Sequence, residues 1–212
     1  MIYIVFILLV LFLIVWVYNK NSCRIIKRYT LPYGYVEIVD SQCQDGLPHT
    51  SSPYTIRMTE KDWNSSRRDT ILLHEKVHLH QRQNPTVWRN FYERVWDYEF
   101  TRVPPPNIPS YWVERVRPNP DTEEGLWSVW RRRWVFFPTY GRGDGLRDAI
   151  TKVWDLQTQK MVDIPMEWKQ FFCTGRICPY QNEHPHEISA EFITNTSQSP
   201  ASQKLHAFLA TV

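Results

Sequence analysis

Residues 70–83, TILLHEKVHLHQRQ, constrain the fold most, because they combine a helical pattern with side chains that can hold and use a metal ion. At about 100° per residue, positions four apart lie on one helix face, so His74 and His78 can bind the same ion. Glu75 completes the pattern H-E-x-x-H, in which the glutamate can act as a general base beside the ion. The stretch favours a metal-binding helix over the alternative of an ordinary solvated helix face.

The residues on either side predict where this helix and the next one begin. Ser66 and Asp69 have the spacing of a capping box, which predicts a helix start at Ser66. Asn84 and Pro85 end the helix, and Pro85 is suited to begin a second one that runs to about Phe100. Two apolar stripes on the second helix predict a face that packs in the core: Val87, Phe91 and Val95, and beside them Trp88, Tyr92 and Trp96.

A catalytic zinc site needs a third protein ligand, and two pairs of acids lie downstream at helical spacing. Glu93 and Asp97 form the first pair, and Glu187 and Glu191 form the second. In each pair the first acid can bind metal while the second accepts the other ring N–H of a histidine ligand. We favour Glu187, because its helix carries small side chains that permit close approach. His184 and His186 remain alternative ligands.

These residues carry a resemblance to a known family. The run His74-Glu75-x-x-His78-x-x-Gln81, followed by Pro185-His186-Glu187-Ile188-Ser189-Ala190-Glu191, resembles the gluzincin type of HExxH zinc metallopeptidase. It is similar in particular to small bacterial and viral domains with the pattern H-E-x-x-H-x-x-Q and later P-[aromatic]-E-x-x-A. The resemblance implies Zn²⁺ as cofactor, with His74, His78 and Glu187 as metal ligands and Glu75 as general base. Gln81 and Glu191 would then hold the ligands in place.

The function that follows is a membrane-anchored, zinc-dependent metallopeptidase-like protein, which hydrolyses peptide bonds of a peptide or protein substrate with a zinc-activated water. The alternative is a non-enzymatic, membrane-anchored structural or interaction protein, such as a viral or envelope component, with a structural or vestigial metal site. Five residues can stabilise the oxyanion of a hydrolase: Tyr111, Tyr140, Tyr180, His184 and Arg142.

The N-terminal stretch predicts a membrane anchor. Residues 2–17 carry no polar group except the Tyr3 hydroxyl, and residues 2–18 are long enough to cross a lipid bilayer as a helix. No basic segment precedes the stretch and no A-x-A-like site follows it, which favours an uncleaved anchor over a signal peptide. By the positive-inside rule, four basic residues place the folded domain in the cytoplasm and the N-terminus outside. They are Lys20, Arg24, Lys27 and Arg28.

Charge and cysteine content leave two further questions. A formal net charge of +3 is too small to indicate a nucleic-acid partner, and none is expected. The basic run Arg131–Arg133 lies among tryptophans, and we interpret it as the edge of a strand or helix rather than a surface for bases or lipid. Cys173 and Cys178 are more compatible with a local disulfide or free thiols than with a zinc knuckle, and Cys23 and Cys43 leave the redox state open.

The predicted fold is α+β: a transmembrane helix, then a small zincin-like domain with a helical metal-binding core, a short β-sheet and a Trp/Pro-rich insertion. Strands are expected at residues 33–39 and 54–59. The oligomeric state stays open. The predicted parts are an anchor (1–19), a basic juxtamembrane segment (20–28), a metallopeptidase-like domain (29–193) with an insertion at about 103–180, and a C-terminal tail (194–212).

Overall fold

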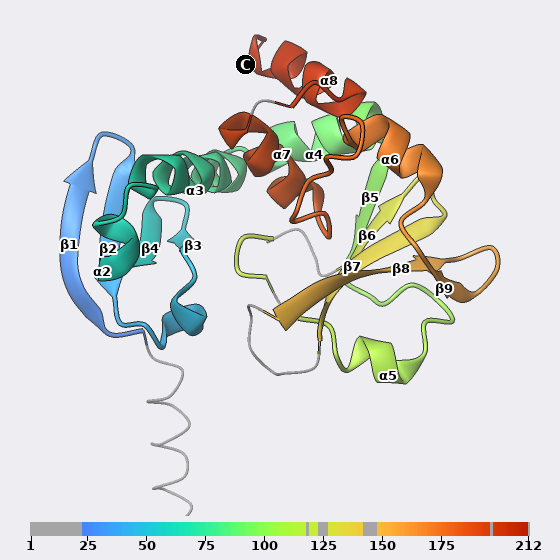
Figure 1. Cartoon of the computed structure of the whole chain (residues 1–212), viewed down its shortest axis with the longest axis horizontal. Helices are drawn as coiled ribbons and strands as arrows, with labels where there is room; N and C mark the ends of the chain where they lie inside the picture. The colour runs from blue at the N-terminus through green and yellow to red at the C-terminus, as the bar shows by residue number, and fades with distance from the viewer. Residues whose placement is uncertain (1–22, 118, 123–126, 142–147, 196, 212) are drawn as a thin grey trace, which may run out of the picture.

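A long helix, α3 (Arg68–Gln83), lies between two β-sheets in the computed structural model (Figure 1). The structure describes residues 23–211 apart from 118, 123–126, 142–147 and 196. The chain forms the first sheet, continues through α3 and α4 (Pro85–Val95), builds the second sheet, and ends in three helices that cover it. These are α6 (Met166–Phe172), α7 (Pro185–Thr194) and α8 (Pro200–Leu209). A short helix, α2 (Glu60–Trp63), precedes α3.

The first sheet confirms both expected strands and adds two more. Its strand order is β1-β2-β4-β3, with β2 parallel to β4 and the outer strands antiparallel. Alternate apolar side chains of the central strands, such as Val36 and Ile56, pack against Leu79 of α3. Because β3 is the last strand in this order, it is an edge strand, and it lies beside α3. The strands are β1 (Ile25–Leu31), β2 (Gly34–Val39), β3 (His49–Ser52) and β4 (Thr55–Thr59).

Four of the five strands of the second sheet lie in the region predicted as an insertion, at about 103–180. Its five strands form an antiparallel meander in sequence order. One face, with Trp130 and Phe136, packs on the helices, and the other, with Val135 and Phe137, packs on the segment around α5 (Ser110–Val113). Because both faces of the central strands β6 and β7 are buried, their sequences are largely apolar and show no clear alternation. They are β5 (Tyr98–Thr101), β6 (Trp127–Trp130), β7 (Trp134–Tyr140), β8 (Ala149–Asp155) and β9 (Lys160–Val162).

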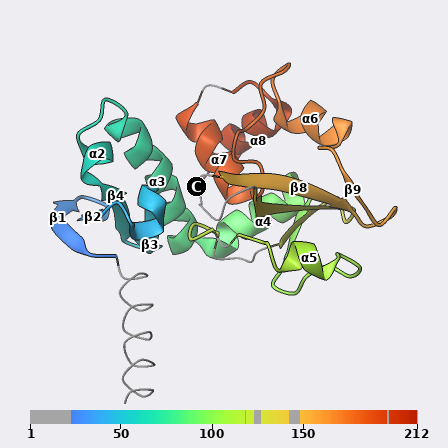
Figure 2. The ribbon, with the colours of Figure 1, turned by 60° about the horizontal axis from the view of Figure 1, so that its bottom comes forward.

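The helices on this sheet correct two predicted boundaries (Figure 2). The second helix starts at Pro85 as predicted, but it ends at Val95, and the chain turns through Asp97, whose φ is +63°, into β5. The C-terminal region is not a simple tail: α8 begins behind Ser199, which caps it by accepting from the Ser202 N–H, and Leu205 is fully buried. The aromatic stripe predicted for α4 forms the centre of the main core, with Trp88, Tyr92 and Trp96 buried.

The basic run is part of a tight turn between β6 and β7, which confirms the structural interpretation. Trp130 pairs with Trp134, and the Arg133 N–H donates to the Trp130 carbonyl at 3.1 Å. Arg131 and Arg132, the central residues of this turn, both have positive φ, at 50° and 53°, as a turn of the primed type requires. Each arginine pairs with an acid on a neighbouring element: Arg131 with Glu167 at 3.3 Å, Arg132 with Glu99 at 2.6 Å, and Arg133 with Asp155 at 2.9 Å.

The predicted membrane topology is corrected. The proposed anchor at residues 2–18 lies outside the described residues, and among the helices that are described none has both the length and the apolar character to span a bilayer. The longest of them, α3, has 16 residues and carries charged side chains throughout. Among the described residues the fold class is α+β with no transmembrane helix, so the predicted first element and the single-pass membrane assignment are not supported.

The disulfides bear on the predicted cytoplasmic location as well. Cys23 bonds with Cys43, and Cys173 with Cys178. Disulfides persist mainly in oxidising compartments, so both bonds argue against a cytoplasmic domain. The predicted juxtamembrane segment is also partly structured, because β1 begins at Ile25.

Asp155 at the end of β8 gives a test of the second sheet. Hydrogen bonds from Arg133 hold the pKa of this carboxyl at about 2, against the opposing effect of burial. Because folding lowers this pKa, the stabilisation is present above about pH 4 and is lost as the pH falls toward 2. Replacing Asp155 with Ala should lower the free energy of unfolding by about 1.5–3 kcal/mol at pH 7.

Urea denaturation at pH 7 and at pH 3 measures this effect. The control is Asp163→Ala at an exposed carboxylate, which should change stability little. A loss for Asp155→Ala that did not shrink on acidification would contradict the assigned role.

Candidate metal centre

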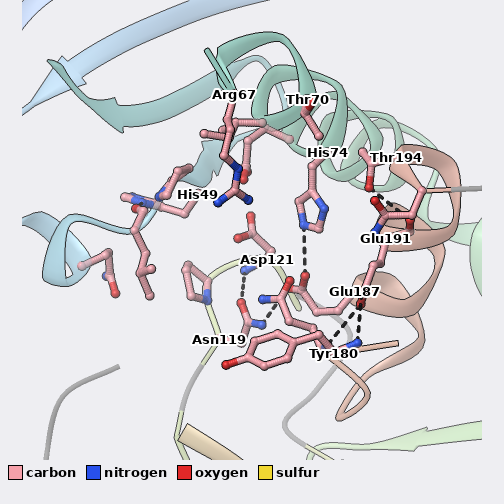
Figure 3. A pocket seen from close by; sticks show the side chains of 18 of the residues that line it. His49, Arg67, Thr70, His74, Asn119, Asp121, Tyr180, Glu187, Glu191 and Thr194 are labelled. Carbon is pink, nitrogen blue, oxygen red and sulfur yellow. Dashed lines mark hydrogen bonds and ion pairs between the residues drawn. The ribbon is translucent and has the colours of Figure 1, made fainter. Parts of the chain in front are cut away.

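Three side chains from remote parts of the chain meet between α3 and α7. The Nε2 atoms of His74 and His78 are 3.1 Å apart, and each lies 3.3 Å from Oε2 of Glu187. Two ligands bound tetrahedrally at zinc distances of roughly 2.0–2.1 Å would be about 3.3 Å apart. The three donor atoms therefore already have the spacing that one zinc ion requires. Figure 3 shows His74 and Glu187 facing each other across the opening of the site.

The position of α3 between two cores explains why these polar groups are buried. Val77 packs into the helical core and Leu79 into the core of the first sheet, so both sides of the helix are held. The remaining buried face carries Glu75, His78 and Gln81 and is turned toward α7. A helix that is buried on two apolar sides has little freedom to rotate, which fixes the direction of both histidines.

The partner helix α7 is brought close by small and apolar residues. Pro185 occupies its first turn, and His184 caps it by accepting from the His186 N–H through Nδ1. Ile188 and Ala190 are fully buried in the core shared with α4 and α8. Glu187 thus projects toward α3 from the first turn of α7.

Gln81 holds His78 in the orientation that a metal ligand needs. Its Oε1 lies 2.7 Å from Nδ1 of His78, so the ring donates its Nδ1–H there and turns Nε2 toward the site, where it can bind a metal ion once deprotonated. The amide nitrogen of Gln81 in turn donates toward Tyr92 Oη and Ser189 Oγ, at 3.1 and 2.9 Å. This network joins α3, α4 and α7, and it places Gln81 where the resemblance implied.

Glu191, which was expected to hold a histidine ligand, does not contact one, whereas Asn119 contacts the ligand candidate Glu187. Glu191 accepts from the backbone N–H groups of Tyr180 and Gln181, at 3.0 and 3.2 Å, rather than from a histidine ring. Asn119 donates from Nδ2 to Oε1 of Glu187 at 2.7 Å and thereby orients that carboxylate. Sequence reasoning missed Asn119, although the sequence Asn-Pro-Asp favours the turn in which its Oδ1 accepts from the Asp121 N–H at 2.9 Å.

Glu75 is the buried acid beside the three donors. It is 4% exposed, and its Oε2 has no hydrogen-bond partner among the described residues. Burial raises the pKa of Glu75 well above its ordinary value, and the charges of Asp121 and Glu187 raise it further. A carboxylate with these properties is suited to accept a proton from water in the pocket.

The cluster requires positive charge at its centre. Burial opposes the charged form of Glu187, but the charge of His78 and hydrogen bonds from both histidines hold the pKa of Glu187 well below its ordinary value. Burial likewise lowers the pKa of His78, yet Glu187 and Asp121 together raise it to about 10. A divalent cation satisfies the same requirement, since it binds one carboxylate and two neutral imidazoles.

The other predicted candidates lie away from the three donors. Burial lowers the pKa of His184 well below its ordinary value and that of His186 to about 3, so both rings are neutral, and His186 instead approaches the Asp121 carbonyl through Nδ1. Glu93 pairs with Arg89 on the exposed side of α4. Arg142 lies outside the described residues.

A pocket of about 500 Å³ opens beside the cluster (Figure 3). Of the predicted oxyanion donors, Tyr180 lines it, whereas Tyr111 and Tyr140 do not. Further wall residues come from the first sheet, from the start of α3 and from the loop before β6: His49, Arg67, Arg117, Asn119 and Asp121.

Gln81 allows a test of the centre that leaves the three donors untouched. Replacing Gln81 with Ala should weaken zinc binding by about 10–100-fold, because the tautomer and direction of His78 are then no longer fixed. Competition with a chelating indicator measures the affinity. Gln83→Ala, two residues further on the same helix, is the control and should bind zinc as the unchanged chain does. Equal affinities for both variants would show that the network does not support the site.

Comparison with known proteins adds no relative: no family model, no curated protein and no solved structure matches this chain. The functional argument therefore depends on the geometry of the cluster and its pocket.

Proposed function

We propose that this protein is a zinc-dependent hydrolase of peptide bonds, with His74, His78 and Glu187 as the metal ligands. The observation that supports it best is the set of donor spacings, 3.1–3.3 Å, next to a buried Glu75 that has an unpartnered oxygen. A structural zinc site is usually closed by four protein ligands, whereas at this site three donors from the described residues converge, namely His74, His78 and Glu187. This difference favours a catalytic site over the structural metal site considered as the alternative.

Bound zinc would supply a Lewis acid that polarises the scissile carbonyl and makes water more acidic. Glu75 takes the proton of the attacking water and transfers it to the leaving amine. Asn119 and Gln81 hold Glu187 and His78 in position, so the ligands need little reorganisation during the reaction. Tyr180 is the predicted oxyanion donor whose position at the pocket suits the role.

The edge strand β3 offers a place for an extended substrate, because a peptide can add to a free strand edge. The Thr50 N–H on this edge donates to Oδ1 of Asp121 at 2.8 Å. A peptide that pairs with β3 at this residue has to displace Asp121. The loop that contains Asp121 therefore limits which substrates reach the metal.

Exchanging Glu75 for Gln separates metal binding from catalysis. The variant should retain one zinc per chain and lose peptide hydrolysis by a factor of at least about 10², because an amide cannot take the water's proton. Zinc content by metal analysis and cleavage of a mixed peptide library by mass spectrometry measure the two properties. The control is Glu60→Gln at an exposed residue of α2, which should keep both.

The matching ligand variant is His78→Ala, which should lose the metal and the activity together. Unchanged cleavage by Glu75→Gln would refute the assigned base. Zinc binding without any cleavage by the unchanged chain would instead support the structural alternative.

A further inference from the structure

Arg117 is a second feature of the pocket that neither motif predicts. It lies in the loop between α5 and β6, where its backbone N–H donates to the Pro138 carbonyl of β7 at 3.0 Å. The residue is 7% exposed and lines the same pocket as His74, Glu75 and Glu187. Asn119, only two residues further, reaches the Glu187 carboxylate directly (Figure 3). Arg117 is thus a buried cation in the wall beside the candidate metal centre.

No described residue accepts a hydrogen bond from the Arg117 guanidinium, and its Nε is fully buried without a partner. The Glu187 carboxylate accepts from Asn119 at Oε1 and faces the two histidines at Oε2, and it forms no ion pair with Arg117. Burial and the charge of Glu187 raise the pKa of Glu183 to about 7 although the charge of Arg117 opposes this, and the two side chains form no ion pair. Leaving donors of a buried guanidinium unpaired is costly, which indicates that a ligand completes the site.

The charges around the pocket also favour an anion. Arg67, at the start of α3, extends into the pocket beside His74 (Figure 3), and no described residue pairs with its guanidinium. Three acids of the pocket already have partners: Asp121 accepts from Thr50, Glu191 accepts from two backbone N–H groups, and Glu187 accepts from Asn119. The pocket therefore presents two unpaired cations, and Glu75, the proposed base, is the one lining acid with an unpartnered oxygen among the described residues.

We infer that Arg117 binds a carboxylate of the substrate, so that the preferred substrate is a peptide with an acidic group close to the bond that is cleaved. The planar guanidinium matches a carboxylate with two parallel hydrogen bonds, and the loss of water in a buried wall strengthens the pair. The carboxylate comes either from the C-terminus of a peptide or from an Asp or Glu side chain. This inference rests on the proposed function, because it assigns the substrate class of the same site.

A binding experiment without turnover tests the assignment and distinguishes the two sources. The full chain with Glu75→Gln is loaded with zinc, immobilised and exposed to mixtures of N-acetylated octapeptides. One pair of mixtures differs only in a free or amidated C-terminus, and a second pair differs only in Asp and Glu against Asn and Gln. Retained peptides are quantified by mass spectrometry. We expect one pair to show at least about a 10-fold preference for the acidic member.

Arg117→Gln in the same background should abolish this preference, while Arg115→Gln should retain it. Arg115 is the matched control, because it anchors the same loop to the Tyr140 and Gly141 carbonyls, at 3.3 and 3.0 Å, and does not line the pocket. If Arg117→Gln does not fold, Arg117→Lys replaces it; it keeps the charge, loses the paired geometry and should reduce the preference several-fold.

Two results would overturn the inference: no preference in either pair of mixtures, or a preference that persists in every Arg117 variant. Both are separate from failure of the proposed function. Cleavage that depends on Glu75 but shows no acidic preference removes only the role of Arg117. If acidic peptides bind through Arg117 but the chain neither binds zinc nor hydrolyses peptides, only the proposed peptidase function is refuted.

Discussion

The structure depends on burying charged groups between α3 and α7. His78 and Glu187 are each 1% exposed, and Glu75 is 4% exposed in the same interface. Removing a charge from water costs several kcal/mol per ion even after the protein relaxes, so a cluster of this kind is tolerated only when the groups neutralise one another. The carboxylate of Glu187 facing two imidazoles does this, and a metal ion would do it more completely. Removing either His78 or Glu187 would leave a buried charge without its partner and would destabilise the packing of α3 on α7.

The surrounding cores provide the stability that such a site requires. α3 is held on one side by the first sheet and on the other by the aromatic core of α4, α7 and α8. Gln81, Tyr92 and Ser189 then connect three helices through hydrogen bonds, with all three side chains buried. This network specifies how the three helices are oriented, since a misplaced helix would leave several buried polar groups unpaired. A rigid frame of this kind keeps the three donor side chains and Glu75 in position without a bound ligand.

The sequence predicts the parts of this arrangement that follow from helical periodicity. The spacing of His74, Glu75 and His78 determines their common face once the helix exists, and the small residues after Glu187 allow close approach to α3. The start of α3 was less predictable: it begins at Arg68, and its preceding residue makes no side-chain cap, although the sequence around Ser66 suggested one. The second sheet was missed because both of its faces are buried, which removes the alternation by which strands are recognised. Asn119 and Arg117 were missed for the same reason, since the position of their loop depends on its contacts with β7 of that sheet.

That loop explains why the second sheet matters to the site. Val116 bridges to Thr139 of β7, and the Arg117 N–H bonds to Pro138, so the sheet fixes the loop to its own edge. From there the loop places Asn119 on Glu187, the proposed metal ligand, and Asp121 on the strand edge at Thr50. The two motif helices can hold a metal, but they contribute only part of the wall that meets a substrate. If the proposed function holds, changes in this loop would alter which substrates bind while leaving the three donors in place, so that metal binding and substrate specificity would be separable properties of the fold.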